Sequence, residues 1–383
     1  MQHLRGQNEV LLFRTVKGGN VSPLLKRLQT QLVEEMDPFR RAEIRATCAA
    51  YHARVGDFHV ARQEIAETRQ SFGDGRSGRV TILLMLAEAL VFHFGELSPS
   101  AADRVARALL LSKAMRDREL IALTSAWMGY FQFEKSNFEL SLRSIAEALE
   151  NASGTDHAAM SRCAVVLLNS FAMCGDWVSS QHWFLKGREH ALAEGDQASV
   201  DALLHSKAVF GVAWLRVKRC SGEVDEAALA RSRLEIASAR NLQRLTQIGA
   251  HEDYIELADA MLSSIEERHE VALAKMRSLE EKGPFPVRHF NHSVQAIERA
   301  FCCAGLGHID DALEALQEID RAEIANLDVD DLLVAEWLMN EIAVKDPRLG
   351  EFGSTPDRLQ AARSSHEQAV AALQKLLSKF SKT

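Results

Sequence analysis

The sequence predicts an all-α protein in which helix pairs follow one another along an elongated array. Three observations favour this fold class. Hydrophobic residues make up 47% of the chain and only 7 of its 383 residues are proline, so the composition argues against general disorder. Ala, Leu, Glu and Arg, which favour helices, are abundant, whereas Val, Ile and Thr form few long runs. Turn signals also recur at a regular spacing.

The turn signals define the length of the repeat. They fall near positions 56, 95, 136, 175, 222, 267 and 307, which are 39 to 47 residues apart. Repeats of about 20 to 50 residues are typical of solenoids, in which one helix pair cannot cover its apolar stripe alone and stacks on its neighbours. The sequence therefore predicts an α-solenoid of about seven to eight antiparallel helix pairs.

The clearest unit spans residues 122–149 and reads as two helices joined by a turn at 136–138. Gly129 lies midway along the first helix, where a small residue lets the second helix approach closely. The inner stripe of the second helix is formed by Ser141, Ile145 and Ala148. This segment is predicted to be a structural repeat.

Cap and breaker residues predict the other elements in chain order. Residues 1–21 lack a clear period and are expected to form an N-terminal arm. Pro after Ser22 and again after Asp37 opens helices over about 22–36 and 37–54. Further helices are expected through 61–68, 80–94, 100–115, 157–173, 180–187, 199–220, 227–240, 245–265, 270–282, 290–306, 310–319, 327–345 and 357–380.

These elements are expected to form one repeat array over 22–345, followed by a loop and a C-terminal capping helix over 346–383. The strongest helix break within the array is the Gly-Pro-Phe-Pro segment at 283–286. The apolar run at 80–94 is shorter than the roughly 20 residues that span a bilayer, so a core helix is expected there. The chain also begins without an apolar leader segment, and a cytoplasmic protein is expected.

The 6 cysteines lie inside predicted helices and lack metal-binding spacing, so buried free thiols are expected. His289 and His292 are the nearest approach to a metal-ligand pair, but no third ligand follows at a defined spacing. No nucleophile motif and no acid and base pair at motif spacing is present either. We therefore expect no catalytic residues, no metal and no cofactor.

The net charge of −8 argues against a general nucleic-acid role. Between His308 and Asp346, however, 12 acidic residues face only two basic ones. This segment is interpreted either as a solvated face or as an acidic docking surface for a basic partner, formed by Asp310, Asp311, Glu314, Asp328, Asp330 and Asp331. No membrane partner is expected.

A basic patch formed by Arg216, Lys218 and Arg219 lies near the end of a predicted helix. Basic residues at this position complement the helix dipole, which is one interpretation, and an acidic-ligand site is the other. Head-to-tail pairing of this patch with the acidic segment of a second copy is a third interpretation, and it would make the protein a homo-oligomer.

Gly129, the turn at 136–138 and the stripe that follows it resemble the signature of the tetratricopeptide repeat. The segments at 56–61 and 307–312 are similar. The longer spacing resembles the long-helix variety found in the sensor regions of maltose-activator-like bacterial regulators, although the chain contains neither a phosphate-binding G-x-x-x-x-G-K-[ST] motif nor an evident helix-turn-helix reader. The resemblance implies a right-handed superhelix with a concave groove.

The family geometry implies that the first helix of each pair lines this groove. The residues expected to face it are Tyr130, Phe133, Glu134, Arg162, Asn169 and Met173. Aromatic, Met and Arg side chains are enriched in protein interfaces. We expect a non-enzymatic scaffold that binds a peptide, loop or helix of a partner protein. The alternative is a sensor whose array binds a small molecule or peptide and changes curvature to control an effector.

Overall fold

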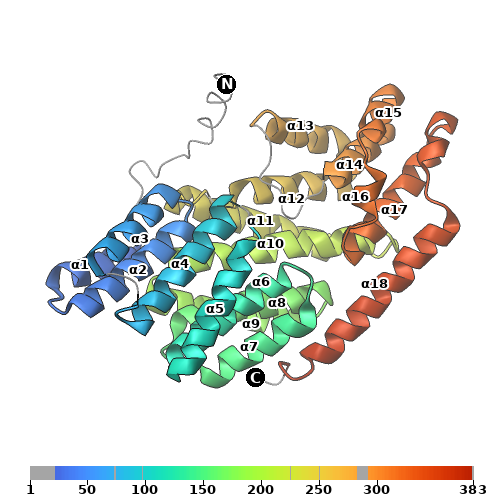
Figure 1. Cartoon of the computed structure of the whole chain (residues 1–383). Coiled ribbons are helices and arrows are strands. Elements are labelled where there is room, and N and C mark those ends of the chain that lie inside the picture. Colours follow the sequence, from blue (N-terminus) through green and yellow to red (C-terminus); the bar gives the residue numbers. More distant parts are fainter. Residues whose placement is uncertain are drawn as a thin grey trace, which may run out of the picture.

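The computed structural model describes residues 22–72, 75–96, 98–224, 226–249, 251–282 and 292–381. Within these ranges all regular secondary structure is helical, so the predicted all-α class is confirmed (Figure 1). The predicted N-terminal arm and the break at 283–286 lie outside the described residues. The N-terminal helices and the C-terminal helices form the two ends of an elongated arrangement.

The described helices begin and end close to the predicted caps. They are α1 (Pro23–Glu34), α2 (Pro38–Arg54), α3 (Phe58–Phe72), α4 (Gly78–Glu96), α5 (Ser100–Met115), α6 (Arg118–Phe133), α7 (Phe138–Asn151), α8 (His157–Met173), α9 (Trp177–Glu194), α10 (Gln197–Arg219), α11 (Glu226–Thr246), α12 (Glu252–Ile265), α13 (His269–Glu280), α14 (His292–Gly305), α15 (Ile309–Gln317), α16 (Arg321–Ile324), α17 (Val329–Ala343) and α18 (Pro356–Leu377), with a 3-10 helix, η1 (Pro347–Phe352), before the last.

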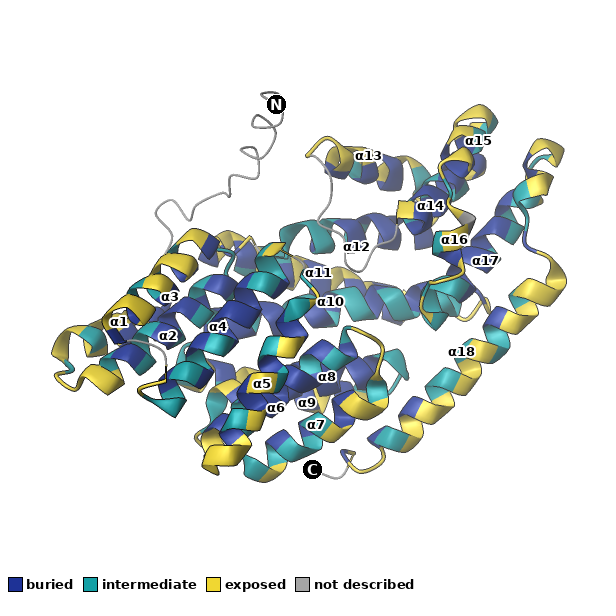
Figure 2. Cartoon of the chain, viewed as in Figure 1, coloured by how far each residue is buried: buried dark blue, intermediate teal, exposed yellow. Residues whose placement is uncertain are grey.

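Neighbouring helices pack consecutively. Contacts join α2 to α3, α4 to α5, α6 to α7, α8 to α9, α10 to α11, α12 to α13, α14 to α15 and α17 to α18. A second set of contacts stacks the first helices of successive pairs, with α6 on α8, α8 on α10 and α10 on α12. This layer holds much of the core, because its helices have neighbours on several sides (Figure 2).

The most enclosed helix is α8, which buries 13 side chains among its 17 residues. It contacts α6, α7, α9, α10 and α18. Its sequence, HAAMSRCAVVLLNSFAM, is apolar around most of its circumference, as expected for a helix surrounded by protein. The polar residues it carries are therefore removed from water. They include Arg162 and Asn169, which were predicted to face the groove.

The pair α6 and α7 shows how the two helices of a repeat are held together. A Cβ atom added to Gly129 would lie 2.6 Å from Cδ1 of Ile145, so only glycine permits this approach. The Ser141 hydroxyl donates a hydrogen bond of 2.7 Å to the Gly129 carbonyl. The next pair repeats the bond, since the Ser180 hydroxyl donates to the Leu168 carbonyl at 3.1 Å. The predicted role of Gly129 is confirmed.

The array closes on itself at its N-terminal end. The amide of Leu24 and the hydroxyl of Ser22 both donate to the carbonyl of Gly195, which ends α9. Arg54 of α2 then pairs with Asp196 at 2.7 Å, and both side chains are buried or nearly so. The start of α1 and the end of α2 are thus fixed to the turn between α9 and α10.

The C-terminal helix also returns to the middle of the chain. In Figure 1, α18 runs diagonally from α17 along one side of the array towards α7. Leu373, Leu377 and Phe380 are buried in the same apolar cluster as Leu142 of α7 and Phe171 of α8. The predicted C-terminal helix therefore exists, and its end packs on the third and fourth helix pairs.

One predicted helix differs from the structure, and two short helices were not predicted. The single helix expected over 245–265 is divided, because Gln247 adopts a left-handed φ of 57° and ends α11, and α12 begins at Glu252. The short helices α16 and η1 were not predicted, since segments of four and six residues have little periodicity.

The apolar segment around α4 behaves as predicted. Among the described residues, α4 is the one helix long and apolar enough to cross a membrane, and here it packs between α2 and α5 with ten side chains buried. All six cysteines are free, and five of them are buried, with Cys174 half-buried.

Replacing Gly129 by Val is expected to lower the free energy of unfolding by about 1–3 kcal/mol, because overpacking at Ile145 outweighs the few tenths gained in helix propensity. The measurement is urea unfolding followed by circular dichroism. Gly154→Val is the control, since a Cβ atom at Gly154 meets no atom within 4 Å. Equal stability of both variants would show that the close approach of α6 and α7 does not depend on glycine.

Candidate functional site

The six residues predicted to line the groove do not form an open surface. Tyr130, Glu134 and Met173 are half-buried. Phe133, Arg162 and Asn169 are only 6%, 5% and 4% exposed, so their expected exposure is corrected. The physical reason is the enclosure of α8, because α6, α10 and the end of α18 pack around the layer in which these residues lie.

Phe133 and Arg162 are used in internal packing. The Phe133 ring lies 5.7 Å from the ring of Phe138 and 5.8 Å from that of Phe210. The Arg162 guanidinium lies 3.9 Å from the ring centre of Trp127, and no ion pair joins it to any described residue. Burial lowers the pKa of Arg162 to about 10. These residues stabilise the stack of α6, α8 and α10.

The predicted basic patch and acidic segment meet within the chain. Arg216 of α10, 4% exposed, pairs with Asp331 of α17 at 2.6 Å. Arg219 pairs with Glu298 of α14 at 2.9 Å, and Arg216 lies 3.7 Å from the same carboxylate. Arg216 and Asp331, which were considered as partners between two copies, therefore pair inside one copy, and association of copies stays a prediction. Lys218, the third member of the patch, pairs with Glu223.

Glu298 is the centre of this ion network. It is fully buried, and the Ser264 hydroxyl of α12 donates to it at 2.7 Å. Arg219 also lies 5.0 Å and 5.2 Å from the ring centres of Phe301 and Trp337. Burial opposes ionisation of Glu298, but the charges of Arg219 and Arg216 outweigh burial and lower its pKa below 4.5. The network joins α10, α12, α14 and α17.

The rest of the acidic segment divides between internal pairs and solvent. Asp310 pairs with Arg348 at 2.9 Å, and Asp311 lies 3.9 Å from His308. Asp328 caps α17 by accepting a hydrogen bond from the Asp331 amide. Glu314 is exposed and has no ion-pair partner among the described residues. The predicted acidic docking surface is thus only partly available, and its role in binding stays a prediction.

Asp330 points to a different location, the surface beneath α18. Its carboxylate lies 3.4 Å from Nε2 of His366 on α18. Burial, together with the charges of Asp328 and Asp331, raises the pKa of Asp330 to about 7. Burial lowers the pKa of His366. Both shifts reduce the charge on this pair near neutral pH, so it holds α18 less strongly than a fully ionised pair would.

A cavity of about 280 Å³ lies between α18 and the array. Its walls come from the end of α8, the second half of α10, the start of α17 and the middle of α18. The main lining residues are Met173, Cys174, Phe210, Ala213, Trp214, Val217, Asp330, Leu333, Arg363, His366 and Val370. The cavity continues the apolar surface on which the end of α18 is seated. We call this whole surface, formed by α7, α8, α10 and α17, the α18-binding surface.

The contacts that hold α18 change along its length. Its first half makes polar contacts, since Arg358 pairs with Glu336 and Arg363 donates to the Cys220 carbonyl at 3.3 Å. It also packs Leu359 and Ala362 on the apolar cluster that contains α17. Its last turns make apolar contacts through Leu373, Leu377 and the following Phe380. Only three of its 22 residues are buried, and the outer side is exposed along the whole helix (Figure 2).

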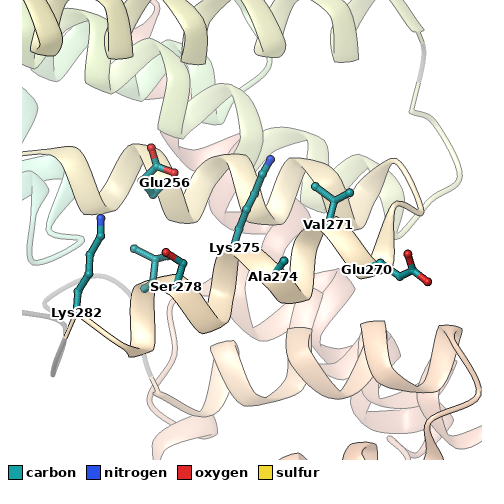
Figure 3. Close-up of a pocket in the computed structure, with 8 residues that line it drawn as sticks. Glu256, Glu270, Val271, Ala274, Lys275, Ser278 and Lys282 are labelled. Atoms are coloured by element: carbon teal, nitrogen blue, oxygen red, sulfur yellow. The ribbon is translucent and has the colours of Figure 1, made fainter.

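A second hollow, of about 420 Å³, lies between α12 and α13 and is drawn in Figure 3. Lys275, Lys282 and Glu256 extend towards it, but each already has an ion-pair partner, on Asp259, Asp253 and Arg240 respectively. Most of the remaining wall comes from one side of α13. We do not assign a site to this shallow groove, because its polar groups are used in holding α11, α12 and α13 together.

The described residues contain no group of three His, Cys, Asp or Glu side chains that could hold a metal ion. His289 lies outside the described residues, and His292 begins α14 beside Glu318. Cys174, the half-buried thiol, is not activated, because burial raises its pKa to about 12.

The sequence did contain a signal for the α18-binding surface. The segment Leu373–Phe380 reads LQKLLSKF, with apolar residues spaced as on one face of a helix. A terminal helix of a repeat array normally has a polar outer face, and the stripe was compatible with simple capping. Nothing local to the stripe indicates that its partner is α7 and α8, more than 200 residues earlier.

Replacing Glu298 by Gln is expected to lower the free energy of unfolding by about 3–5 kcal/mol, because it leaves Arg216 and Arg219 buried with too little negative charge. Glu314→Gln is the matched control on the surface. Denaturant unfolding at pH 7 measures both. A loss of less than about 1 kcal/mol in the Glu298 variant would show that the network is dispensable.

Glu298 also makes the free energy of unfolding depend on pH. Because the pKa of Glu298 is lower in the folded chain than its ordinary 4.5, its contribution to stability is complete above that value and is lost as the pH falls through the folded value. The wild type should therefore lose more stability than Glu298→Gln below pH 4.5. Parallel pH profiles of unfolding for the two proteins would contradict this assignment.

Comparison with protein-family models, with curated proteins and with solved structures finds no match for this chain. The resemblance to tetratricopeptide repeats therefore rests on the repeat units themselves. The structure supports the general architecture that this resemblance implies, a helical array in which consecutive helices pack on each other.

Proposed function

We propose that the protein is a non-enzymatic scaffold that binds a segment of a partner protein on the α18-binding surface. The observation that carries the proposal is the position of α18, since a helix of the chain itself lies across α7, α8 and α17 and shows that this surface accommodates a helix. Binding of an amphipathic helix in an apolar groove is a common mode of protein recognition.

The chemistry of the surface supports this function. Its interior is aromatic and aliphatic, through Phe210, Trp214 and Leu333, and beside it Glu336 of α17 forms an ion pair with Arg358 of α18. An apolar centre with a charged rim is typical of protein interfaces. A partner with basic residues beside an apolar stripe fits such a surface, in agreement with the basic partner predicted from the sequence.

The finer architecture belongs to the same proposal. We infer a right-handed superhelix of about seven to eight helix pairs. The succession of contacts between first helices supports the stacking of the pairs. Six free cysteines favour a reducing compartment, consistent with a cytoplasmic protein of bacterial type. The scaffold is proposed to act without a cofactor.

The second candidate is a ligand-gated sensor, and the cavity of about 280 Å³ favours it. A small molecule in this cavity would touch both α10 and α18 and could change how α18 is seated. Thermal-shift measurements separate the two functions, because a metabolite that binds only the folded protein raises its melting temperature. A scaffold is stabilised by its protein partner instead.

Replacing Ala213 by Arg is expected to weaken partner binding at least about tenfold, or ~1.4 kcal/mol, because a long charged side chain would fill the cavity on α10. The partner is first identified by cross-linking the tagged full chain in its host and then purified for titration. Leu234→Arg is the control, since Leu234 lies on α11 and is 70% exposed.

Circular dichroism confirms that both variants fold. Equal affinity of the two variants for the purified partner would reject the α18-binding surface as the site. A complex that forms only with nucleic acid and weakens steeply with salt would reject the protein scaffold itself.

A further inference from the structure

We infer that α18 is a built-in ligand of the α18-binding surface, and that the external partner is an amphipathic helix that carries the same pattern and competes with α18 for the same place. This inference rests on the proposed scaffold function and adds to it the class of partner and the means of regulation. In the closed state described here, the site is occupied by the chain itself.

The first argument is the pattern of the seated segment. Leu373, Leu376, Leu377 and Phe380 occupy positions i, i+3, i+4 and i+7, the spacing by which helices anchor in apolar grooves. Three of these side chains are 2–4% exposed, and Leu376 packs against the same cluster. The residues between them are exposed. The end of α18 thus meets the array as a ligand helix would.

The second argument is what receives these anchors. The cluster beneath them contains Phe133, Leu142, Leu168 and Phe171, with Phe138 packed at its edge. These residues belong to α6, α7 and α8, which are already complete as consecutive helix pairs. The end of α18 is therefore not required to continue the repeat. It covers an apolar surface that the third and fourth pairs present together.

The third argument is the loose attachment of the helix. Before Leu373, α18 has only Ala362 fully buried, and a cavity separates the side of Val370 from α10. By contrast, α8 buries most of its residues. The polar contacts of Arg358, Arg363 and His366 can be exchanged for water when α18 leaves, because these side chains are partly exposed. Undocking of the end of α18 therefore breaks few contacts outside the helix pair that α18 forms with α17.

These contacts define the partner. Arg358 and Arg363 precede Leu373 by 15 and 10 residues and meet Glu336 and the Cys220 carbonyl. A competing helix should carry basic residues in its first turns and four apolar anchors at the spacing of α18 in its last turns. Such a partner gains the same contacts, and its apparent affinity is reduced by the fraction of molecules in which α18 is docked.

The structure also offers a position for an engineered disulfide that would lock α18 in its docked position. Sγ of Cys174 lies 4.0 Å from the carbonyl oxygen of Val370, and both residues line the cavity. Val370→Cys would place a second thiol on α18 close to Cys174, so that a disulfide fixes the helix to the end of α8. Val370→Ser matches the size of the new side chain without the thiol. Peptide mapping of the oxidised protein verifies which cysteines are joined.

The experiment uses the full chain and a fluorescent peptide with the sequence of residues 358–381. Five proteins are titrated by anisotropy: the wild type, Leu373→Asp with Leu377→Asp, Gln374→Asp with Ser378→Asp, Val370→Cys, and Val370→Ser. The first double variant places two charges on the buried face, whereas the second places the same charges on the exposed face. A peptide with its four anchors replaced by Ser is the negative probe.

We expect the buried-face variant to bind the peptide at least about tenfold more tightly than the wild type, because its own α18 no longer occupies the surface. The exposed-face variant should behave as the wild type. Oxidised Val370→Cys should not bind, and reduction should restore wild-type binding. Val370→Ser should bind as the wild type does, both with and without reduction. The Ser-substituted peptide should bind none of the proteins.

Peptide binding that is equal in the locked and reduced proteins would overturn the inference, even if the buried-face variant fails to fold. The same lock distinguishes this inference from the proposed function. If the purified partner binds the locked protein unchanged, the scaffold stands and α18 is not its competitor. If the peptide responds to the lock but no protein partner exists, α18 is a movable helix and the scaffold function fails.

Discussion

The buried pairing of Arg216 and Arg219 with Glu298 and Asp331 is the constraint on which the C-terminal part of the structure depends. It links α10 to α14 and α17, elements that are about 80 to 115 residues apart in sequence. A buried ion pair adds little net stability, but an unpaired buried charge is costly, so alternative placements of α17 are disfavoured. The network thus determines where α17 sits, and α17 determines the path of α18.

This placement explains why the middle of the array is covered. The start of α17 lies beside α10, and α18, which packs on α17, places Leu373 and Phe380 in the apolar cluster of α7 and α8. At the other end, the bonds from Leu24 and Arg54 to the turn at 195–196 bring the first helices against the same central units. A chain of simple repeats therefore folds back on itself at both ends, and the surface most suited to binding is occupied from within.

Local features of the fold could be predicted from the sequence, and long-range ones could not. Proline after Asp37 indicated the start of α2, and Gly129 indicated the closest approach of two helices, because caps and glycines act within a few residues of themselves. The candidate site was predicted less well. Arg162 was expected in solvent but lies under Trp127, and Arg216 was expected in a basic patch but meets Asp331. The residues beside Arg162 and Arg216 in the sequence do not indicate either of these contacts.

The most direct measurement of the central claim is hydrogen exchange of the full chain with and without its purified partner. In the free protein, amides near Leu373 and Leu377 should be protected together with those at the end of α8. On binding, the account predicts that the amides of α18 exchange faster while those of α8 stay protected, since the partner replaces α18 on the same surface. Unchanged protection of α18 in the saturated complex would contradict it.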